Sequence, residues 1–257
     1  GFGKTEIAIR AAFKAVVSGK QVAVLVPTTI LALQHAQTFR ERLKKFDVKV
    51  DYINRYRTSK EKTAIYKALK AGEVDLLIGT HAILNKQVQF KDMGLLIVDE
   101  EQKFNIGAKE KLRNMRGNVD TLTLTATPIP RTLQFSLMAA RDLSVINTPP
   151  PNRQPIETEV RVFNGEAIKE AIEREVNRGG QVFFVHNRVK SLPDMAAFIK
   201  ELVPNADIAV AHGQMEASAL EQTLMDFIKG YYEVLVCTNI IETGLDISNA
   251  NTIIINN

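Results

Sequence analysis

LLIVDEEQ (residues 95–102) is an apolar run that ends abruptly in three carboxylates. A strand with a continuous apolar sequence is typical of a parallel sheet buried on both faces. The neighbouring sequence repeats the theme, with short β-branched or apolar runs separated by helix-favouring segments near 31–45, 59–71 and 105–116. This alternation predicts parallel βαβ units. The predicted strands are QVAVLVPT (21–28), VKVDYI (48–53), VDLLIGT (74–80), GLLIVDE (94–100) and TLTLTAT (121–127).

A proline-rich stretch, NTPPPNRQP (147–155), interrupts the alternation. Consecutive prolines fit neither a helix interior nor a central strand, so the stretch predicts a domain boundary. We expect one lobe over residues 1–148, a linker over 149–155 and a second lobe over 156–257, with each lobe truncated at a chain end. The second lobe resumes the alternation with predicted strands ETEVRVF (157–163), QVFFVH (181–186), DIAVAH (207–212), EVLVCT (233–238) and TIIIN (252–256), and with helices ending near Asn177, Leu202 and Lys229.

The composition is that of a soluble globular chain, with 45% hydrophobic and 24% charged residues among 257. No apolar run approaches the roughly 18–20 residues that span a bilayer. Cys237 is the single cysteine. An internal disulfide is therefore excluded, which suits the cytoplasm, and its apolar neighbours predict a packed strand residue rather than a nucleophile. The net charge of +4 is compatible with nucleic-acid binding but does not demonstrate it.

The chain opens with GFGKT (1–5), which ends like the phosphate-binding loop G-x-x-x-x-G-K-[ST]. Gly3 would let the backbone approach phosphate, Lys4 would reach the β- and γ-phosphates, and Thr5 would bind magnesium. The helix that follows directs its positive end at the anion. A helix N-terminus with a chance lysine is the alternative. We assign nucleotide contacts to Gly1, Gly3, Lys4, Thr5 and Glu6.

The carboxylates after the apolar strand fit the other half of such a site. Asp99 suits an outer-shell magnesium contact, and Glu100 is placed to orient and deprotonate the attacking water. The alternative is that the three carboxylates simply lie at a solvated junction between strand and loop. The presence of GKT makes this alternative less favoured. TATP follows another strand, and its residues Thr125, Ala126 and Thr127 would carry a hydrogen-bond relay from the nucleotide site.

Taken in order, these motifs resemble those of superfamily 2 helicases. The resemblance spans essentially the whole chain, and within that superfamily it points to the branch of the bacterial transcription-repair coupling factors (Mfd) and the RecG helicases. DEEQKF (99–104) and RDLSVINTPPPNR (141–153) favour the coupling factors. The matching stretches are GKT, PTTILALQ (27–34), GTHAIL (79–84), DEEQ (99–102), TATPIPRTL (125–133), HGQM (212–215) and TNIIETGLDI (238–247).

The resemblance implies two RecA-like lobes of a P-loop NTPase, with ATP and magnesium as cofactors. It implies that Gln102 couples the γ-phosphate to the second lobe, where related proteins carry histidine. It also implies second-lobe contacts from Glu242 and Thr243, which would couple ATP to DNA, and from Gly244 and Asp246, which would face the nucleotide. The DNA-backbone contacts implied or predicted are Pro27, Thr28, Thr29, Gln34, Gly79, Thr80, His81 and Thr238, together with Arg55 and Arg57 of the basic segment NRYRTSKEK (54–62).

Two parts of the family pattern are missing from these residues: the start of the phosphate loop and the late motif with the arginine fingers. An arginine finger contributes roughly 10³–10⁵ in rate. We therefore expect these residues alone to have little ATPase activity, although the parent protein is an ATP hydrolase.

The main hypothesis is an ATP-dependent double-stranded DNA translocase. The resemblance implies a larger parent that engages RNA polymerase and nucleotide excision repair proteins. A RecG-like fork-remodelling helicase is the near alternative. A non-catalytic nucleic-acid-binding module and a small-molecule kinase are alternatives of other classes, and the kinase would leave the second lobe unexplained.

Overall fold

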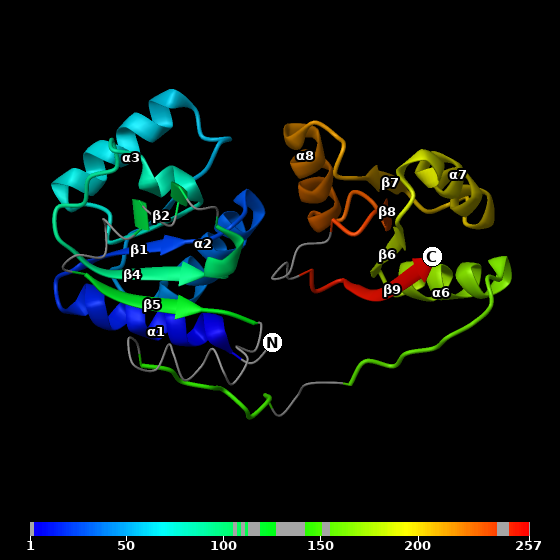
Figure 1. Cartoon of the computed structure of the whole chain (residues 1–257), viewed down its shortest axis with the longest axis horizontal. Helices are drawn as coiled ribbons and strands as arrows, with labels where there is room; N and C mark the ends of the chain where they lie inside the picture. The colour runs from blue at the N-terminus through cyan, green and yellow to red at the C-terminus, as the bar shows by residue number, and fades with distance from the viewer. Residues whose placement is uncertain are drawn as a thin grey trace. The chain divides into compact units, whose positions relative to one another are not determined.

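The computed structural model describes residues 3–104, 107–108, 111–112, 119–126, 142–150, 155–240 and 247–256. The chain divides into two compact units, Gly1–Pro155 and Ile156–Asn257. Each unit contains one parallel sheet with helices against it (Figure 1). The α/β fold class predicted from the alternation of strands and helices is confirmed. None of the helices within these ranges is long and apolar enough to cross a membrane.

The first unit has a five-stranded sheet in the order β2-β3-β1-β4-β5, and every neighbouring pair is parallel. Alternate side chains of the central strand enter different cores. Val22 and Val24 pack with the helices of one face, whereas Ala23 and Leu25 pack on the other. Burial on both faces explains the continuous apolar sequence. The strands are β1 Gln21–Leu25, β2 Val50–Ile53, β3 Leu76–Gly79, β4 Met93–Asp99 and β5 Asp120–Leu124.

Among the described residues of this unit, three long helices cover the sheet, with α1 (Lys4–Val17) and α3 (Ser59–Ala71) on opposite sides (Figure 1). Helix α2 (Thr29–Leu43) shares the core of α1 and begins at the N-cap Thr28, whose hydroxyl accepts the Leu31 N–H. Side-chain capping of this kind stabilises a helix by roughly 1 kcal/mol. The predicted helix over 105–116 lies mostly outside the described residues. Short 3-10 helices are η1 His81–Leu84 and η2 Glu101–Lys103.

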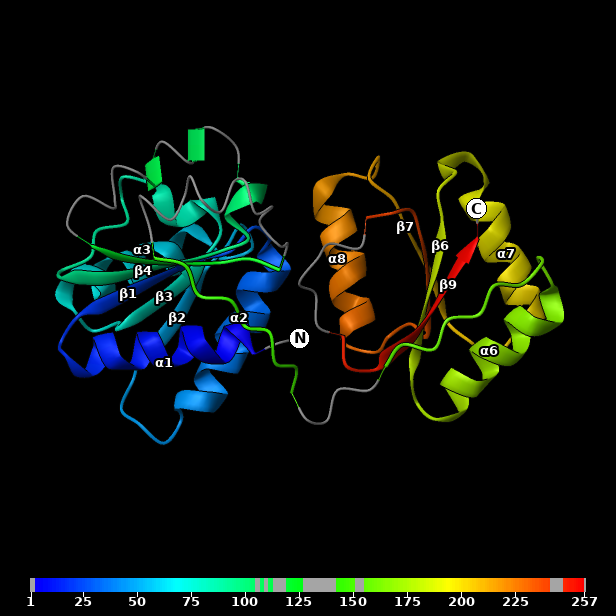
Figure 2. The same cartoon turned by 60° about the horizontal axis from the view of Figure 1, so that its bottom comes forward.

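The second unit has a four-stranded parallel sheet in the order β7-β8-β6-β9. Figure 2 shows α8 on one face of this sheet and α6 and α7 on the other. Phe183 packs against Phe227 of α8, with ring centroids 5.0 Å apart, while Phe184 faces the core of α6 and α7. The elements are α6 Gly165–Asn177, β6 Gln181–His186, η3 Val189–Ser191, α7 Leu192–Leu202, β7 Ile208–Ala211, α8 Ala217–Ile228, β8 Val234–Cys237 and β9 Ala250–Asn256.

The two units repeat one arrangement, because β7-β8-β6-β9 corresponds in order to β2-β3-β1-β4. A buried glutamine begins the central strand of each. The amide of Gln21 donates to the carbonyls of Leu69 and Val74, and that of Gln181 donates to those of Phe227 and Tyr232. The pairing register shifts immediately after each glutamine. The duplication is therefore visible at the level of single side chains.

The prediction of a strand at 157–163 is wrong. Residues 155–164 form no strand, and Val160 and Val162 are 96% and 90% exposed. A strand is stabilised by a ladder of hydrogen bonds to a neighbour. Neither sheet, as far as the structure describes the chain, pairs with this segment.

Candidate functional site

The phosphate-loop residues and the acidic box meet at the start of α1 and the end of β4. Gly3 adopts a left-handed conformation (φ 80°), and its carbonyl accepts the N–H groups of Glu6 and Ile7. An L side chain is strained in that conformation, so this turn requires glycine. The next residue, Lys4, places Nζ 3.6 Å from Oε1 of Glu100. The first and second motifs, 96 positions apart in the chain, therefore share one site.

The backbone and the side chain of Glu100 both have partners in the fold. It is 4% exposed and has a positive φ of 50°, the single non-glycine case among the residues that the structure covers. Its backbone N–H donates to the Leu124 carbonyl at 2.9 Å, which fixes the turn beside β5. A buried carboxylate is costly unless it has a cation or hydrogen-bond donors, and Glu100 has both.

The predicted relay residues contact this same carboxylate. The Ala126 N–H donates to Oε1 at 3.1 Å, and the Thr125 hydroxyl lies 3.4 Å from Oε2. Gln102 donates from its side-chain amide to Oε2. Thr127, the remaining member of the predicted relay, lies outside the described residues. The structure thus connects Thr125, Ala126 and Gln102 directly to Glu100.

Asp99 faces a different partner. Its Oδ2 lies 3.4 Å from Nε2 of His35 on α2, and the two side chains are 13% and 11% exposed. Sequence reasoning gave His35 no role and did not predict this approach to Asp99. The available signal was its position one residue after Gln34 in a predicted DNA-contact motif, which says nothing about distance to Asp99.

Glu6 was predicted to contact nucleotide, and in the structure it forms ion pairs within the first unit. Its carboxylate accepts hydrogen bonds from Arg42 and Arg10. These hydrogen bonds, from Arg42 and then from Arg10, lower the pKa of Glu6. Glu6 thereby ties α1 to α2. Thr5 is half-buried on the first turn of α1.

The residues present fit a magnesium–nucleotide complex. Magnesium at such sites is held by one or two protein groups, with phosphates and water completing the octahedron. Asp99 and Thr5 have oxygen atoms that could serve as ligands of that kind, and Lys4 has a cation that could pair with phosphate. No cluster of three or more histidine, cysteine or acidic residues suited to a metal occurs in the described ranges, and this mode of binding requires none.

The first proposed DNA-contact motif lies where β1 leads into α2. Thr28 is half-buried and its hydroxyl accepts the Leu31 N–H at 3.2 Å, yet a hydroxyl that accepts one hydrogen bond still has a proton to donate. Thr29 is 7% exposed. Pro27 and Gln34 are half-buried.

The second motif follows β3. A Cβ at Gly79 would lie 2.6 Å from the Ile53 carbonyl oxygen, so the glycine is explained by the close pairing of β3 with β2. Thr80 is buried and His81 is exposed at the start of η1. Of this motif, His81 is the residue with an exposed side chain.

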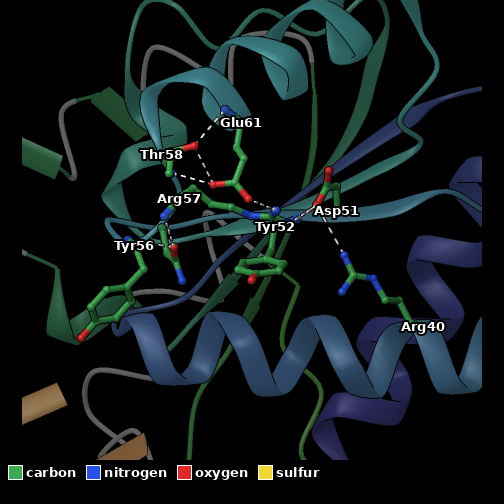
Figure 3. Close-up of polar contacts among 8 residues, drawn as sticks. Arg40, Asp51, Tyr52, Tyr56, Arg57, Thr58 and Glu61 are labelled. Atoms are coloured by element: carbon green, nitrogen blue, oxygen red, sulfur yellow. Dashed lines mark hydrogen bonds and ion pairs between the residues drawn. The ribbon is translucent and has the colours of Figure 1, made fainter. Parts of the chain in front are cut away.

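The two predicted arginines of the basic segment differ in their surroundings. Arg57 forms ion pairs with Asp51 and Glu61, both at 3.0 Å, and its guanidinium lies 4.3 Å from the centre of the Tyr52 ring (Figure 3). Arg55 is exposed, with its guanidinium 5.8 Å from the Tyr56 ring. Figure 3 shows Tyr56 directed away from the ion pairs.

The capping box of α3 completes this cluster. The Thr58 N–H and hydroxyl donate to Glu61 at 2.7 and 2.8 Å, and Arg57 donates to its other oxygen. These contacts, that of the Thr58 N–H first, lower the pKa of Glu61 to about 2. The cluster fixes the loop that presents Arg55 and Tyr56.

In the second unit, Thr238 follows β8 and its N–H donates to the Ala211 carbonyl at 3.2 Å. Its side chain is half-buried. Gly1, Glu242, Thr243, Gly244 and Asp246, all assigned to nucleotide or coupling roles, lie outside the described residues.

Comparison with known proteins adds family matches to this geometry. Residues 1–135 match the DEAD/DEAH box helicase family, and residues 164–257 match the helicase conserved C-terminal domain. The chain is 56% identical over 255 residues to the transcription-repair-coupling factor of Staphylococcus haemolyticus and 55% identical to that of Staphylococcus aureus. It covers 22% of each relative, so it spans about a fifth of their length.

Solved structures give the same architecture. RecG bound to a three-way DNA junction superposes with a TM-score of 0.81 at 35% identity, over 98% of this chain and 34% of that one. Dbp5 of S. cerevisiae bound to RNA and ADP BeF3 superposes at 0.61 with 18% identity, over 96% of this chain and 66% of that one, a likeness of fold alone. The two sheets are therefore those of two RecA-like helicase lobes.

Proposed function

Because this chain belongs to the DEAD/DEAH box helicase family, we propose that it is the ATP-driven motor of a larger protein that translocates on double-stranded DNA during transcription-coupled repair. The 56% identity to a transcription-repair-coupling factor supports the repair role. RNA polymerase and nucleotide excision repair proteins are the proposed partners of the parent protein. A motor that works on bacterial chromosomal DNA acts in the cytoplasm.

One observation carries the catalytic part of the proposal: Glu100 is buried and its carboxylate contacts Lys4, Thr125 and the Ala126 N–H. Glu100 would accept the proton of the attacking water, and Lys4 would bind the phosphates of ATP. Bound magnesium would neutralise charge on those phosphates, with Thr5 and Asp99 holding the ion and its water.

The hydrogen-bond relay would respond to whether ATP or its hydrolysis products occupy the site. Thr125, Ala126 and Gln102 contact Glu100, so a change in what Glu100 binds would alter three hydrogen bonds outside the phosphate loop. We propose that Thr127, Glu242 and Thr243 extend this relay and that Gly1, Gly244 and Asp246 contact nucleotide. The stretch 149–155 would act as the linker between the lobes.

The proposed DNA contacts are sugar–phosphate contacts, which position a protein without reading sequence. We propose that Arg55 and His81 provide exposed groups for this purpose and that Thr28, Thr29, Gln34, Thr80 and Thr238 add hydrogen bonds.

The test uses the full-length protein. Its ATPase and its displacement of a triplex-forming strand from linear duplex DNA are measured with and without an intact Lys4. ATP-dependent displacement from plain duplex that is lost in Lys4→Ala supports translocation. ATPase activity that is stimulated by forked DNA but not by plain duplex would instead favour a RecG-like fork-remodelling helicase. The structural similarity to RecG supports this second candidate.

A further inference from the structure

His35 and Asp99 approach each other at the edge of the proposed magnesium site. Nε2 of the imidazole lies 3.4 Å from Oδ2 of the carboxylate, and both side chains are nearly buried. His35 lies on α2, whereas Asp99 ends β4, so only the tertiary fold brings them together. An acidic group with this little exposure requires a polar partner.

Among the described residues, the ion-pair partner of the Asp99 carboxylate is His35. The ring is oriented by packing, since it meets Phe39 edge-on at 6.3 Å between centroids. Its Nδ1 is buried and has no hydrogen-bond partner among the described residues. A proton on Nε2 therefore suits the site, because an N–H then faces the carboxylate and no buried N–H is left unpaired at Nδ1.

Helix α2 also carries the first proposed DNA-contact motif. Thr28 caps the helix, Thr29 begins it and Gln34 immediately precedes His35. A helix moves as a unit, so a force on its first turns is transmitted to a side chain about 9 Å along its axis. The ring of His35 is therefore placed between the proposed DNA-contact segment and the carboxylate that would hold magnesium.

We propose that His35 is a positioning residue for Asp99 and that it couples DNA contact at the start of α2 to magnesium binding. The inference rests on the proposed function. His35 contacts Oδ2, and Oδ1 has no partner among the described groups, so the histidine would orient one oxygen while the other faces the ion's water. Partners that orient metal-binding carboxylates typically contribute 10- to 100-fold in metal affinity or activity.

The experiment measures the magnesium concentration needed for the full-length protein to bind a fluorescent non-hydrolysable ATP analogue. His35→Leu should raise that concentration roughly 10-fold. His35→Gln keeps an N–H donor of similar reach and should restore most of the affinity. Thr38→Val changes an exposed residue one turn further along the same helix and should match the wild type, as a control for α2 itself.

A double-mutant cycle with Asp99→Asn isolates the pathway. If His35 acts through Asp99, adding His35→Leu to Asp99→Asn causes no further loss of magnesium affinity. Additive losses, or a His35→Leu protein with wild-type magnesium dependence, would overturn the inference. If Asp99→Asn alone leaves magnesium dependence unchanged, Asp99 does not serve the ion and the proposed site itself is wrong.

Two further measurements distinguish a role of His35 in positioning Asp99 from a role in packing alone. Long-range ¹H–¹⁵N spectra of nucleotide-free protein should show the Nε2 resonance of His35 shifting in Asp99→Asn. DNA affinity should be unchanged in His35→Leu while the DNA-induced increase in ATPase falls several-fold. A variant that loses DNA affinity and melting temperature together would instead show that His35 serves only packing.

Discussion

Nζ of Lys4 lies 3.6 Å from Oε1 of Glu100, and the Ala126 N–H donates to that same oxygen at 3.1 Å. One carboxylate oxygen thus joins the phosphate loop, the acidic box and the relay motif. In a buried position such an oxygen has few ways to move without losing a partner. A substitution at Glu100 would therefore affect all three motifs at once.

Glu100→Gln in the full-length protein should bind ATP with near wild-type affinity but lose about 10²- to 10⁴-fold in turnover, because an amide cannot accept the proton of the attacking water. Steady-state ATPase and equilibrium nucleotide binding measure the two effects separately. Glu101→Gln is the matched control, since Glu101 contacts Thr123. If Glu100→Gln had normal turnover and Glu101→Gln lost it, the general base would be Glu101 instead of Glu100.

Arg55→Ala should mainly affect DNA binding, whereas Arg57→Ala should mainly affect stability. Arg55 is exposed, so its loss should weaken DNA binding and reduce the salt slope by about one, with a smaller change in melting temperature than Arg57→Ala causes. Arg57 contacts Asp51, Glu61 and the Tyr52 ring, so its loss should lower stability by roughly 1–2 kcal/mol. Thermal melts and DNA titrations on both variants decide this. Equal melting temperatures for the two variants would contradict the distinction.

DNA binding by the full-length protein should weaken steeply as salt rises and should depend little on sequence, because the proposed contacts go to phosphates. Fluorescence titrations on two unrelated duplexes at several salt concentrations test both features. A flat salt response would contradict contacts to phosphates, and a strong preference for one duplex would indicate contacts to bases.

The Glu61 contacts predict a pH dependence with a defined sign. The pKa of Glu61 is lowered from 4.5 to about 2 in the folded chain, so its contribution to stability is present above about 4.5 and is lost as pH falls toward 2. Glu61→Gln should therefore lower the melting temperature at neutral pH, with the difference shrinking over that window. Lys60→Gln, a neighbour on α3, serves as the control. A ¹³C titration of the Glu61 carboxyl with a midpoint near 4.5 would be inconsistent with these contacts.

Cys237 should be inert in the folded chain. It is completely buried in β8, and burial raises the pKa of its thiol to about 12, whereas the thiolate is the reactive form. A thiol reagent at pH 8 should react only as fast as the chain unfolds, and rapidly in denaturant. Stoichiometric modification under native conditions within minutes would show that β8 opens locally.

The strands and helices could be predicted closely because their signals are local. Apolar runs predicted the buried strands, and the helix-favouring segment near 59–71 predicted α3 (Ser59–Ala71). The structure shows that Thr58 and Glu61 form a capping box at its start. The segment 157–163 shows the limit of this reasoning. Its alternating pattern is that of a strand, but a strand also needs a neighbour, and no local pattern reveals whether one is present.

The sequence alone determined the parallel α/β class and the family resemblance, because each depends on residue type and spacing within a few positions. The same reasoning led us to propose Lys4, Asp99 and Glu100 as site residues. Only the tertiary structure decided that Glu6 and Arg57 are engaged in ion pairs and that His35 faces Asp99. Such contacts join residues up to 64 positions apart, as His35 and Asp99 are, and their distance is set by how α2 packs on the sheet. Packing arises from the whole core, so no stretch of sequence read by itself contains it.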